Sequence, residues 1–302
     1  MRWRHPSIGC ALWLLGVASP GVAFFEGHAA GSRALALGGN FVSIANDASA
    51  VYWNPAGVAR LSRHQALFTL DRSPDLEGVQ QLFAATVLHT PVVSVAVGWS
   101  AMSLEETMRE DLLSLSISRQ LVRRTLGAFV SAGATLKAAR IGLDAAEASA
   151  IAGARQDETR WSGDFGLLMS PIPNVTVGAC VRNLGQPQFD LIEGGATTAL
   201  ETAVEWGLSL RLHPQAQLHW SRAHLADRSA ENKLGVEFRV GNALEVRFGA
   251  ARQSLSTGIA VRWRDFRVEP SFRVHDELGL MTRIAFQIDF GAPHAGGSVD
   301  DF

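Results

Sequence analysis

The sequence predicts an all-β protein, and specifically a transmembrane antiparallel β-barrel of about 14 strands. The first observation behind this prediction is an alternation of apolar and polar residues with a period of two, which gives a strand two different faces. The second is that about fourteen such segments occur, most of them about ten residues long, the length that a tilted strand needs to cross a bilayer. The third is that no apolar run after residue 23 approaches the roughly 20 residues of a membrane helix.

The first 23 residues have the pattern of a secretory signal peptide. Two arginines precede an apolar run from Ile8 to Val17, and residues 21–23 are small, as a signal peptidase requires. We therefore expect residues 1–23 to be cleaved and the rest of the chain to be exported. Cys180 is then the only remaining cysteine, which excludes an internal disulfide framework.

Residues 24–62 are dense in turn signals and form the next predicted segment. The pair Gly38–Gly39 allows backbone conformations that are closed to other residues. The pair Asn46–Asp47 can close a turn on its own backbone, and Asn54 begins a second turn in which Pro55 fixes φ. Such a segment folds compactly without being a strand or a long helix.

Residues 63–290 carry the alternating pattern of the predicted barrel. Near the end, four apolar residues from Ile284 to Phe290 interleave with Arg283, Ala285, Gln287 and Asp289. The pattern predicts strands at 63–71, 78–89, 92–101, 111–121, 125–138, 160–170, 174–183, 203–213, 215–224, 231–241, 243–252, 255–264, 266–275 and 280–290. The alanine-rich stretch from Leu143 to Ala154 fits a longer extracellular loop, and the glycine-rich residues 291–302 fit a disordered tail.

Alternation alone leaves the direction of the apolar face open. A soluble two-sheet sandwich could bury that face, whereas a barrel of about fourteen strands turns it to lipid and keeps a lumen. The second reading is favoured by charged residues that alternate with apolar ones and would face a wet or plugged lumen. These residues are Arg182, Glu205, Arg211, Glu237, Arg239, Glu245, Arg247, Arg262, Arg264, Arg267, Glu269 and Arg273. A solvated outer face is the alternative.

The polar face changes along the chain. Early strands offer small residues, as in Gly98 and Ser116, whereas later strands offer the charges named above. Small residues leave room, so we expect segment 24–62 to pack against the early wall, while charges on the later wall pair across the interior.

Aromatic residues give weaker support for the membrane barrel. Six tryptophans follow the signal peptide, and several of them lie at the ends of predicted strands, where an interfacial belt would sit. They are Trp53, Trp99, Trp161, Trp206, Trp220 and Trp263. Tyr52 is the only tyrosine, which is fewer than such barrels usually carry.

Composition and motifs exclude several function classes. Hydrophobic residues make up 47% of the chain, charged residues 19%, and the net charge is -2, so no basic excess indicates nucleic acid. Nine histidines are scattered without a metal-binding spacing, and there is no nucleophile elbow or phosphate loop. The sequence therefore predicts a protein that is not an enzyme and needs no cofactor or metal.

The turn-rich segment resembles the amino-terminal region of the FadL and PorV-like outer-membrane barrel superfamily. The similarity lies in the order Gly-x-Arg-Ala-x-x-Leu-Gly-Gly, then Asp-Ala-Ser-Ala, then Tyr-Trp-Asn-Pro-Ala-Gly, between residues 31 and 57. The run Val181 to Gly185 is similar to a strand-to-loop signature of PorV-like barrels. The resemblance implies an outer membrane of a Gram-negative type, and a hatch inside the lumen built on Gly38, Gly39, Asp47, Asn54, Pro55, Ala56 and Gly57.

Three functional classes follow. The resemblance to FadL implies passive uptake of hydrophobic small molecules past the hatch, whereas the resemblance to PorV implies a scaffold that binds exported proteins at the cell surface. The third class is a soluble periplasmic β-protein. The expected partners are membrane lipids and either a hydrophobic small molecule or an exported protein. Within the hatch we expect Asp47 to take charge-assisted hydrogen bonds from inward arginines.

Overall fold

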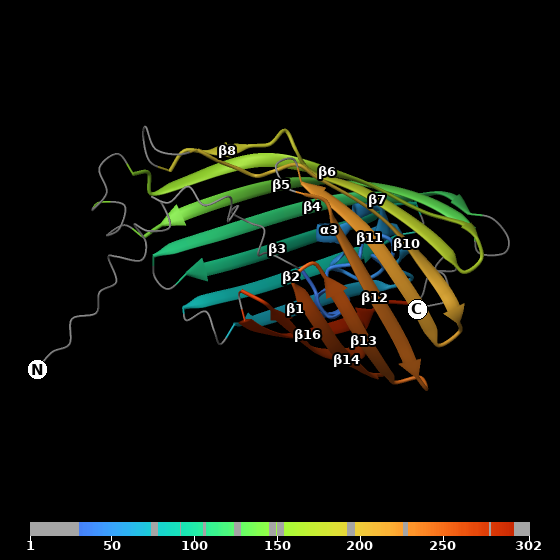
Figure 1. Ribbon diagram of the computed structural model, residues 1–302. Coiled ribbons are helices and arrows are strands. Elements are labelled where there is room, and N and C mark those ends of the chain that lie inside the picture. Colours follow the sequence, from blue (N-terminus) through green and yellow to red (C-terminus); the bar gives the residue numbers. More distant parts are fainter. Residues whose placement is uncertain are drawn as a thin grey trace, which may run out of the picture.

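The computed structural model shows a closed antiparallel barrel of 14 strands (Figure 1). It describes residues 30–73, 78–90, 92–104, 107–123, 128–144, 149, 154–191, 197–225, 229–277 and 279–292. The predicted signal peptide, most of the expected loop from Leu143 to Ala154, and most of the expected tail lie outside these residues. The membrane-barrel fold predicted from the alternation is thereby confirmed.

Neighbouring strands in the wall follow the chain, and β16 closes the barrel onto β1. The wall strands are β1 (His64–Arg72), β2 (Val79–His89), β3 (Ser94–Leu104), β4 (Met108–Arg123), β5 (Phe129–Leu143), β6 (Asp157–Ile172), β7 (Val175–Leu184), β10 (Ala203–His213), β11 (Ala216–Leu225), β12 (Glu231–Val240), β13 (Leu244–Ala251), β14 (Ser254–Trp263), β15 (Phe266–His275) and β16 (Gly279–Phe290). Two short strands, β8 (Gln188–Phe189) and β9 (Thr198–Ala199), form a separate hairpin that the sequence pattern did not predict.

Strands β4, β5 and β6 are longer than predicted, with 16, 15 and 16 residues. Most of the extra residues lie at the end of the barrel that carries Leu104 and Leu143, which we call the Leu143 end. The apolar alternation stops there, but the ladder continues because charged residues pair on the outer surface, as in Arg140 with Asp157. In Figure 1 these strands project at the left beyond the crossing strands of the later wall.

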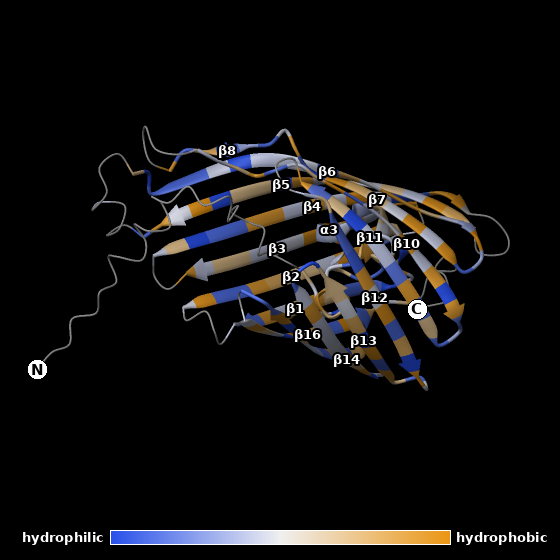
Figure 2. Cartoon of the chain, viewed as in Figure 1, coloured by the Kyte–Doolittle hydropathy of each residue, from blue (hydrophilic) through white to orange (hydrophobic). Residues whose placement is uncertain are grey.

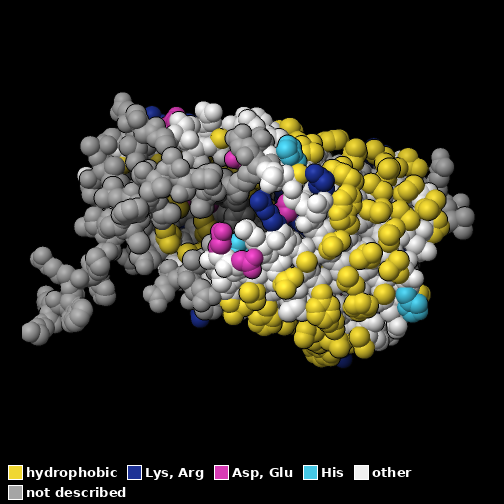
Figure 3. All heavy atoms as spheres, in the orientation of Figure 1, with side chains coloured by type: hydrophobic (Ala, Val, Ile, Leu, Met, Phe, Trp, Pro, Cys, Tyr) yellow, Lys and Arg dark blue, Asp and Glu magenta, His cyan; other side chains and the backbone are white. Residues whose placement is uncertain are grey.

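Apolar and polar residues alternate along the wall strands (Figure 2), and the apolar side chains are the exposed ones on the outer face of the barrel. Leu113, Leu115 and Ile117 of β4 point outward and are 52–57% exposed, while the serines between them are buried. Hydrophobic side chains cover much of the outer face in Figure 3. Burying such a face in a soluble core is incompatible with a closed barrel whose interior is already full. The two-sheet sandwich is therefore excluded, and the apolar face is turned to lipid.

Aromatic residues divide between the two faces. Trp161, Trp206 and Trp263 are exposed on the outside, as expected of residues that contact lipid. Trp53 instead lies inside the barrel, where its indole nitrogen donates to the Ala30 carbonyl at 2.7 Å. Trp53 is therefore not part of an interfacial belt.

Three short helices lie inside the barrel. They are α2 (Ser32–Ala36), α3 (Ala50–Trp53) and the 3-10 helix η1 (Pro55–Arg60). No helix in the described part of the chain is long and apolar enough to cross a membrane. Helix α2 packs against β13 to β16, whereas η1 packs against β4, β5 and β6. The expected packing against the early wall alone is therefore wrong, because α2 rests on the later one.

The wall closes through a seam of aromatic and charged contacts between β1 and β16. His64 lies opposite Phe290, with ring centroids 5.4 Å apart. Arg63 donates to the Gly291 carbonyl at 3.0 Å, and the Arg283 guanidinium forms a bidentate pair with Asp71 inside the barrel. The seam thus depends on the chain up to Gly291.

We expect Phe290→Ala to destabilise the seam by roughly 0.5–1 kcal/mol, the size of a cross-strand aromatic contact. The variant should yield less folded barrel in the membrane fraction, measured by heat-modifiable migration on a gel. Deleting residues 293–302, which retains Gly291, should leave both the amount and the migration unchanged. If the deletion removes the barrel from the membrane fraction and Phe290→Ala does not, assembly depends on residues 293–302 and not on the aromatic contact of Phe290.

Candidate functional site

The lumen is filled by residues 30–61, which we call the luminal segment. Almost every residue of this segment is buried. Its turns form as the sequence indicates, because Gly38 and Gly39 adopt φ of 68° and 77°, a region that favours glycine. Asn54 caps η1 by accepting from the Ala56 amide at 3.1 Å, and Pro55 occupies the first turn.

Inward-facing glycines of the wall let the segment approach as bare backbone. A Cβ atom at Gly249 would lie 2.1 Å from the Gly38 nitrogen, and one at Gly178 would lie 2.2 Å from the Val42 carbonyl oxygen. Eight strands carry such a glycine against the segment: Gly98, Gly133, Gly166, Gly178, Gly207, Gly235, Gly249 and Gly258. Three cross-strand pairs are glycine on both sides, at 133 with 166, 178 with 207 and 235 with 249.

A glycine also permits a close backbone contact within the luminal segment. A Cβ atom at Gly57 would lie 1.6 Å from the Ala45 carbonyl oxygen, so this position of η1 admits only glycine. Ala56 is fully buried and packs with Phe129 and Leu168 of the wall. The similarity to the Asn-Pro-Ala-Gly motif therefore falls on residues that fix the turn and its fit to β5 and β6.

Hydrogen bonds tie the segment to several strands. The Asn54 amide donates to the carbonyls of Val42 at 2.8 Å and of Leu167, on β6, at 3.1 Å. Asn40 donates to the Lys233 carbonyl of β12 at 3.1 Å, and the Gln65 side chain of β1 accepts from the Ala48 amide. The Val42 carbonyl and the Ala48 amide of the segment are thereby hydrogen-bonded inside the barrel.

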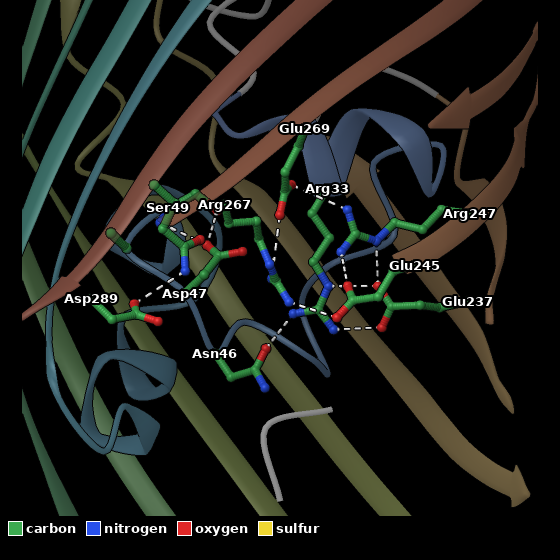
Figure 4. A network of polar contacts seen from close by, with 12 residues as sticks. Arg33, Asn46, Asp47, Ser49, Glu237, Glu245, Arg247, Arg267, Glu269 and Asp289 are labelled. Carbon is green, nitrogen blue, oxygen red and sulfur yellow. Dashed lines mark hydrogen bonds and ion pairs between the residues drawn. The ribbon is translucent and has the colours of Figure 1, made fainter. Parts of the chain in front are cut away.

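A buried charge network joins the segment to the later wall (Figure 4). Arg33 of α2 donates to both carboxylate oxygens of Glu237 at 2.8 Å, a bidentate pair whose side chains are 5% and 1% exposed. Arg247 then contacts three carboxylates on β12, β13 and β15, and Arg267 of β15 shares two of them. The network comprises Arg33, Glu237, Glu245, Arg247, Arg267 and Glu269, so three positive charges face three negative ones.

Asp47 is placed beside this network but bonds differently from the expectation. Its carboxylate accepts from the amide and the hydroxyl of Ser49, at 2.8 and 2.5 Å, which is a local turn rather than a pair with an arginine. Burial raises the pKa of the Asp47 carboxyl, while the nearby Arg33 acts to lower it. Asp47 thus shapes the segment, and Arg33 is the residue that anchors it.

A second buried group lies around Glu205. Lys233 and Arg182 each approach its carboxylate at 3.2 Å, and Ser221 donates to it. The Arg182 guanidinium also lies 5.8 Å from the ring centroid of Tyr52. This group therefore connects the wall to Tyr52 of α3.

The remaining predicted residues are more peripheral. Arg239 lies 3.9 Å from Glu245, and Arg273 donates to Ser256 at 3.4 Å. Arg262 borders a polar cavity of about 40 Å³ beside Arg33, which is space for on the order of one water molecule. Arg211 is half-buried near the end of β10. Arg264 is the exception, because it lies exposed in the turn after β14 and does not face the lumen.

Several lumen residues were missed by sequence reasoning. Lys137 of β5 and Asp164 of β6 form an ion pair at 2.6 Å with both side chains almost fully buried. Both alternate with apolar outward residues, so the two-residue period contained the signal. Arg33 was recognised only as part of the resemblance, since a single arginine in a turn-rich segment reveals no partner. Among the described residues, no group of three or more His, Cys, Asp or Glu could hold a metal ion.

We expect Glu237→Gln to loosen the segment, because it leaves Arg33 and Arg247 buried with a neutral partner. Losing one member of a buried ion pair typically costs about 3–5 kcal/mol. The change should lower the midpoint of urea unfolding and speed protease cleavage within residues 30–61. The exposed pair of Arg140 and Asp157 supplies the control, since Asp157→Asn should cost less than about 1 kcal/mol. Equal effects of the two variants would show that the network does not hold the segment.

Gly249→Ala tests the backbone fit directly. The new methyl group would overlap the backbone of Leu37 and Gly38, which a rotamer change cannot relieve, so the segment must shift. Single-channel conductance in planar bilayers should rise. The matched control is Gly142→Ala on β5, where the nearest atoms to an added Cβ atom would be 3.9 Å away, an ordinary van der Waals contact. If the conductance of a folded Gly249→Ala barrel is unchanged, the close approach of the luminal segment to Gly249 does not keep the lumen closed.

Solved structures of other proteins share this architecture, although the sequence comparisons find no match. No protein-family model matches the sequence, and no curated protein matches it. Among solved structures, the CymD monoaromatic hydrocarbon channel superposes with a TM-score of 0.66 at 14% identity, covering 87% of this chain and 98% of CymD. The toluene transporter TodX of P. putida gives 0.65 at 12% identity, covering 88% and 99%. A FadL homologue of Pseudomonas aeruginosa gives 0.58 at 11% identity, covering 86% and 98%.

These likenesses extend along almost the whole described chain, although the sequences have diverged widely. They agree with the resemblance that the sequence shows between residues 31 and 57. The chain therefore has the fold of the FadL-type outer-membrane channels.

Proposed function

We propose that this protein is an outer-membrane channel for passive uptake of hydrophobic small molecules, with the luminal segment as its hatch. The observation that carries the proposal is the combination of a closed, lipid-facing barrel with a lumen filled by one short segment that is not a strand of the wall. Structures of the same fold include a toluene transporter and a monoaromatic hydrocarbon channel. The proposed location is the outer membrane, reached after cleavage of residues 1–23.

The distribution of contacts supports a hatch that can move. The segment is attached through side chains and glycine contacts, not as a strand of the wall ladder. The wall keeps its backbone hydrogen bonds when the segment shifts, so the energetic cost of movement falls on the luminal contacts. Gly38, Gly39, Asn54, Pro55 and Gly57 would keep the segment in one piece during such a shift.

A second candidate, an interaction barrel that binds exported proteins, is favoured by how firmly the segment is held. Two buried ion groups and contacts to most wall strands describe a permanent filler as well as a hatch. In that case the barrel would act through its outer end, and the lumen would carry no solute.

Uptake distinguishes the two candidates. We expect cells that lack their own hydrocarbon channels to take up radiolabelled toluene faster when they express this protein, and faster still with Gly249→Ala. Intact cells are needed because plain phospholipid bilayers are themselves permeable to small apolar molecules. The control is Gly142→Ala at equal surface amount. Uptake equal to vector-only cells, for folded parent and Gly249→Ala alike, would reject the channel and leave the interaction barrel.

A further inference from the structure

A small polar cavity lies where the luminal segment meets the later wall, at the end of the barrel opposite the Leu143 end. Its volume is about 40 Å³, room for on the order of one water-sized species. Arg33 and Asp47 line it from the segment, while Arg262 of β14 and Arg267 of β15 line it from the wall. Arg33, Asp47 and Arg267 are seen together in Figure 4. Whatever fills this cavity therefore contacts both the segment and the wall.

The cavity lies at the end of the barrel where short turns join the strands. Two residues join β10 to β11 and β14 to β15, and three residues join β12 to β13. Arg262 and Arg267 stand on either side of the turn between β14 and β15. Short turns of outer-membrane barrels face the periplasm, and longer loops face the exterior. In the proposed membrane location, the cavity is therefore on the periplasmic side.

Two arginines meet across the ladder at this cavity. Arg262 and Arg267 lie directly opposite each other, and like charges in such a position destabilise a sheet. Arg267 is balanced by Glu245 and Glu269, at 2.6 and 3.3 Å. Among the described residues, the only hydrogen bond of Arg262 is the one that its backbone amide donates to the Ala243 carbonyl. The guanidinium of Arg262 is thus a half-buried positive charge with no ion pair in this part of the chain.

The cavity also contains an unused buried donor. Arg267 is only 7% exposed, yet its Nε atom has no hydrogen-bond acceptor in the described part of the protein. A buried N–H without an acceptor costs free energy, and the cost is greater when the group is charged. Both arginines therefore favour an occupant that accepts hydrogen bonds and carries a negative charge.

The carboxylates that border the cavity are already engaged elsewhere. Glu245 is paired with two arginines of the network, and Asp47 accepts from Ser49. Asp289 accepts from the Gln65 side chain at 2.7 Å. None of these three carboxylates forms an ion pair with the arginine of β14. Because they repel a second negative charge, an anion has to lie on the side of the cavity formed by β14 and β15.

We propose that this cavity binds a single halide ion, chloride in the cell, between Arg262 and Arg267. A monoatomic anion is close to a water molecule in size and fits the volume, whereas a phosphate or a carboxylate group does not. The ion neutralises the repulsion across β14 and β15 and keeps Arg267 in the network that holds Arg33. Chloride thereby favours the seated position of the luminal segment. The proposal does not depend on what the barrel transports.

Protease cleavage within residues 30–61 measures this effect on the purified full-length barrel in detergent. The rates are compared in sodium chloride and in sodium isethionate, whose anion is too large for the cavity. Equal ionic strength keeps the screening of the charge network the same in both salts. At a chloride concentration ten times the dissociation constant, we expect cleavage to be on the order of tenfold slower than in isethionate, since the ion binds only the seated state.

Arg262→Gln tests whether the opposed arginines are the reason. The variant should lose the chloride dependence, and in isethionate it should be cleaved more slowly than the parent because the repulsion is gone. The matched control is Arg264→Gln, which removes an exposed arginine that does not face the lumen and should keep the full chloride dependence. Chloride protection that persists in Arg262→Gln, or that is absent from the parent, overturns the proposal.

Bromide provides a second measurement that needs no variant. Crystals of the parent soaked in sodium bromide should show an anomalous difference peak between Arg262 and Arg267. A peak without chloride protection in solution would indicate binding at crystal concentration only, and it would overturn the role of the ion in holding the segment. The absence of a peak from well-ordered crystals would overturn the site itself and leave water as the occupant of the cavity.

Discussion

The close approach of the luminal segment to the inner wall is the constraint on which the rest of the structure depends. A barrel of 14 strands encloses more space than its own side chains fill. Here the space is filled by backbone on backbone, at positions such as Gly178 and Gly249 where any side chain would collide. Because the close contact depends on glycine having no side chain, the wall tolerates a larger residue at these positions only if the segment moves.

The buried charges follow from this fit. A segment seated so closely excludes water, so each charge at its edge needs a partner of opposite sign. Arg33 supplies a positive charge from the segment, and the wall answers with Glu237, which Arg247 shares. The glycines determine how near the segment can lie, and the Arg33 network determines which part of the segment faces β12. Fit and registry therefore come from different residues.

The period-two alternation was enough to locate all fourteen wall strands, because a membrane strand presents alternate residues to lipid and to the lumen. The choice of a barrel over a sandwich also needed the charged residues of the polar face. The alternation is lost where the outward face of a strand does not contact lipid. At the Leu143 end of β4 to β6, charged residues continue the ladder, and the sequence pattern reads them as loop. The β8 and β9 hairpin was missed for a related reason, since each of its strands has only two residues and Phe189 belongs to no periodic pattern.

The wall positions that contact the luminal segment could be predicted from the sequence only in part. Small residues of the early strands were recognised as room for the segment, but glycines such as Gly235 and Gly249 lie among charged residues, which dominate the appearance of the later strands. Only the cross-strand register brings Gly235 and Gly249 side by side and separates them from Glu237 and Arg247 one step further along. Register depends on turns far from the lumen, so the full set of eight glycines could not be derived from any single strand.

The lumen is therefore divided into two chemically different parts. Around Tyr52 and Phe189 it is aromatic and aliphatic, whereas around Arg33 it consists of paired charges. An apolar solute loses nothing by leaving water for the first part. In the second part it would separate buried ions from their partners, at a cost of several kcal/mol for each pair. A static pore between the two would thus oppose the solutes that the first part suits. In the proposed channel, passage of an apolar molecule would require the luminal segment to move with its charge network either intact or rehydrated, so this network would set the barrier to such movement.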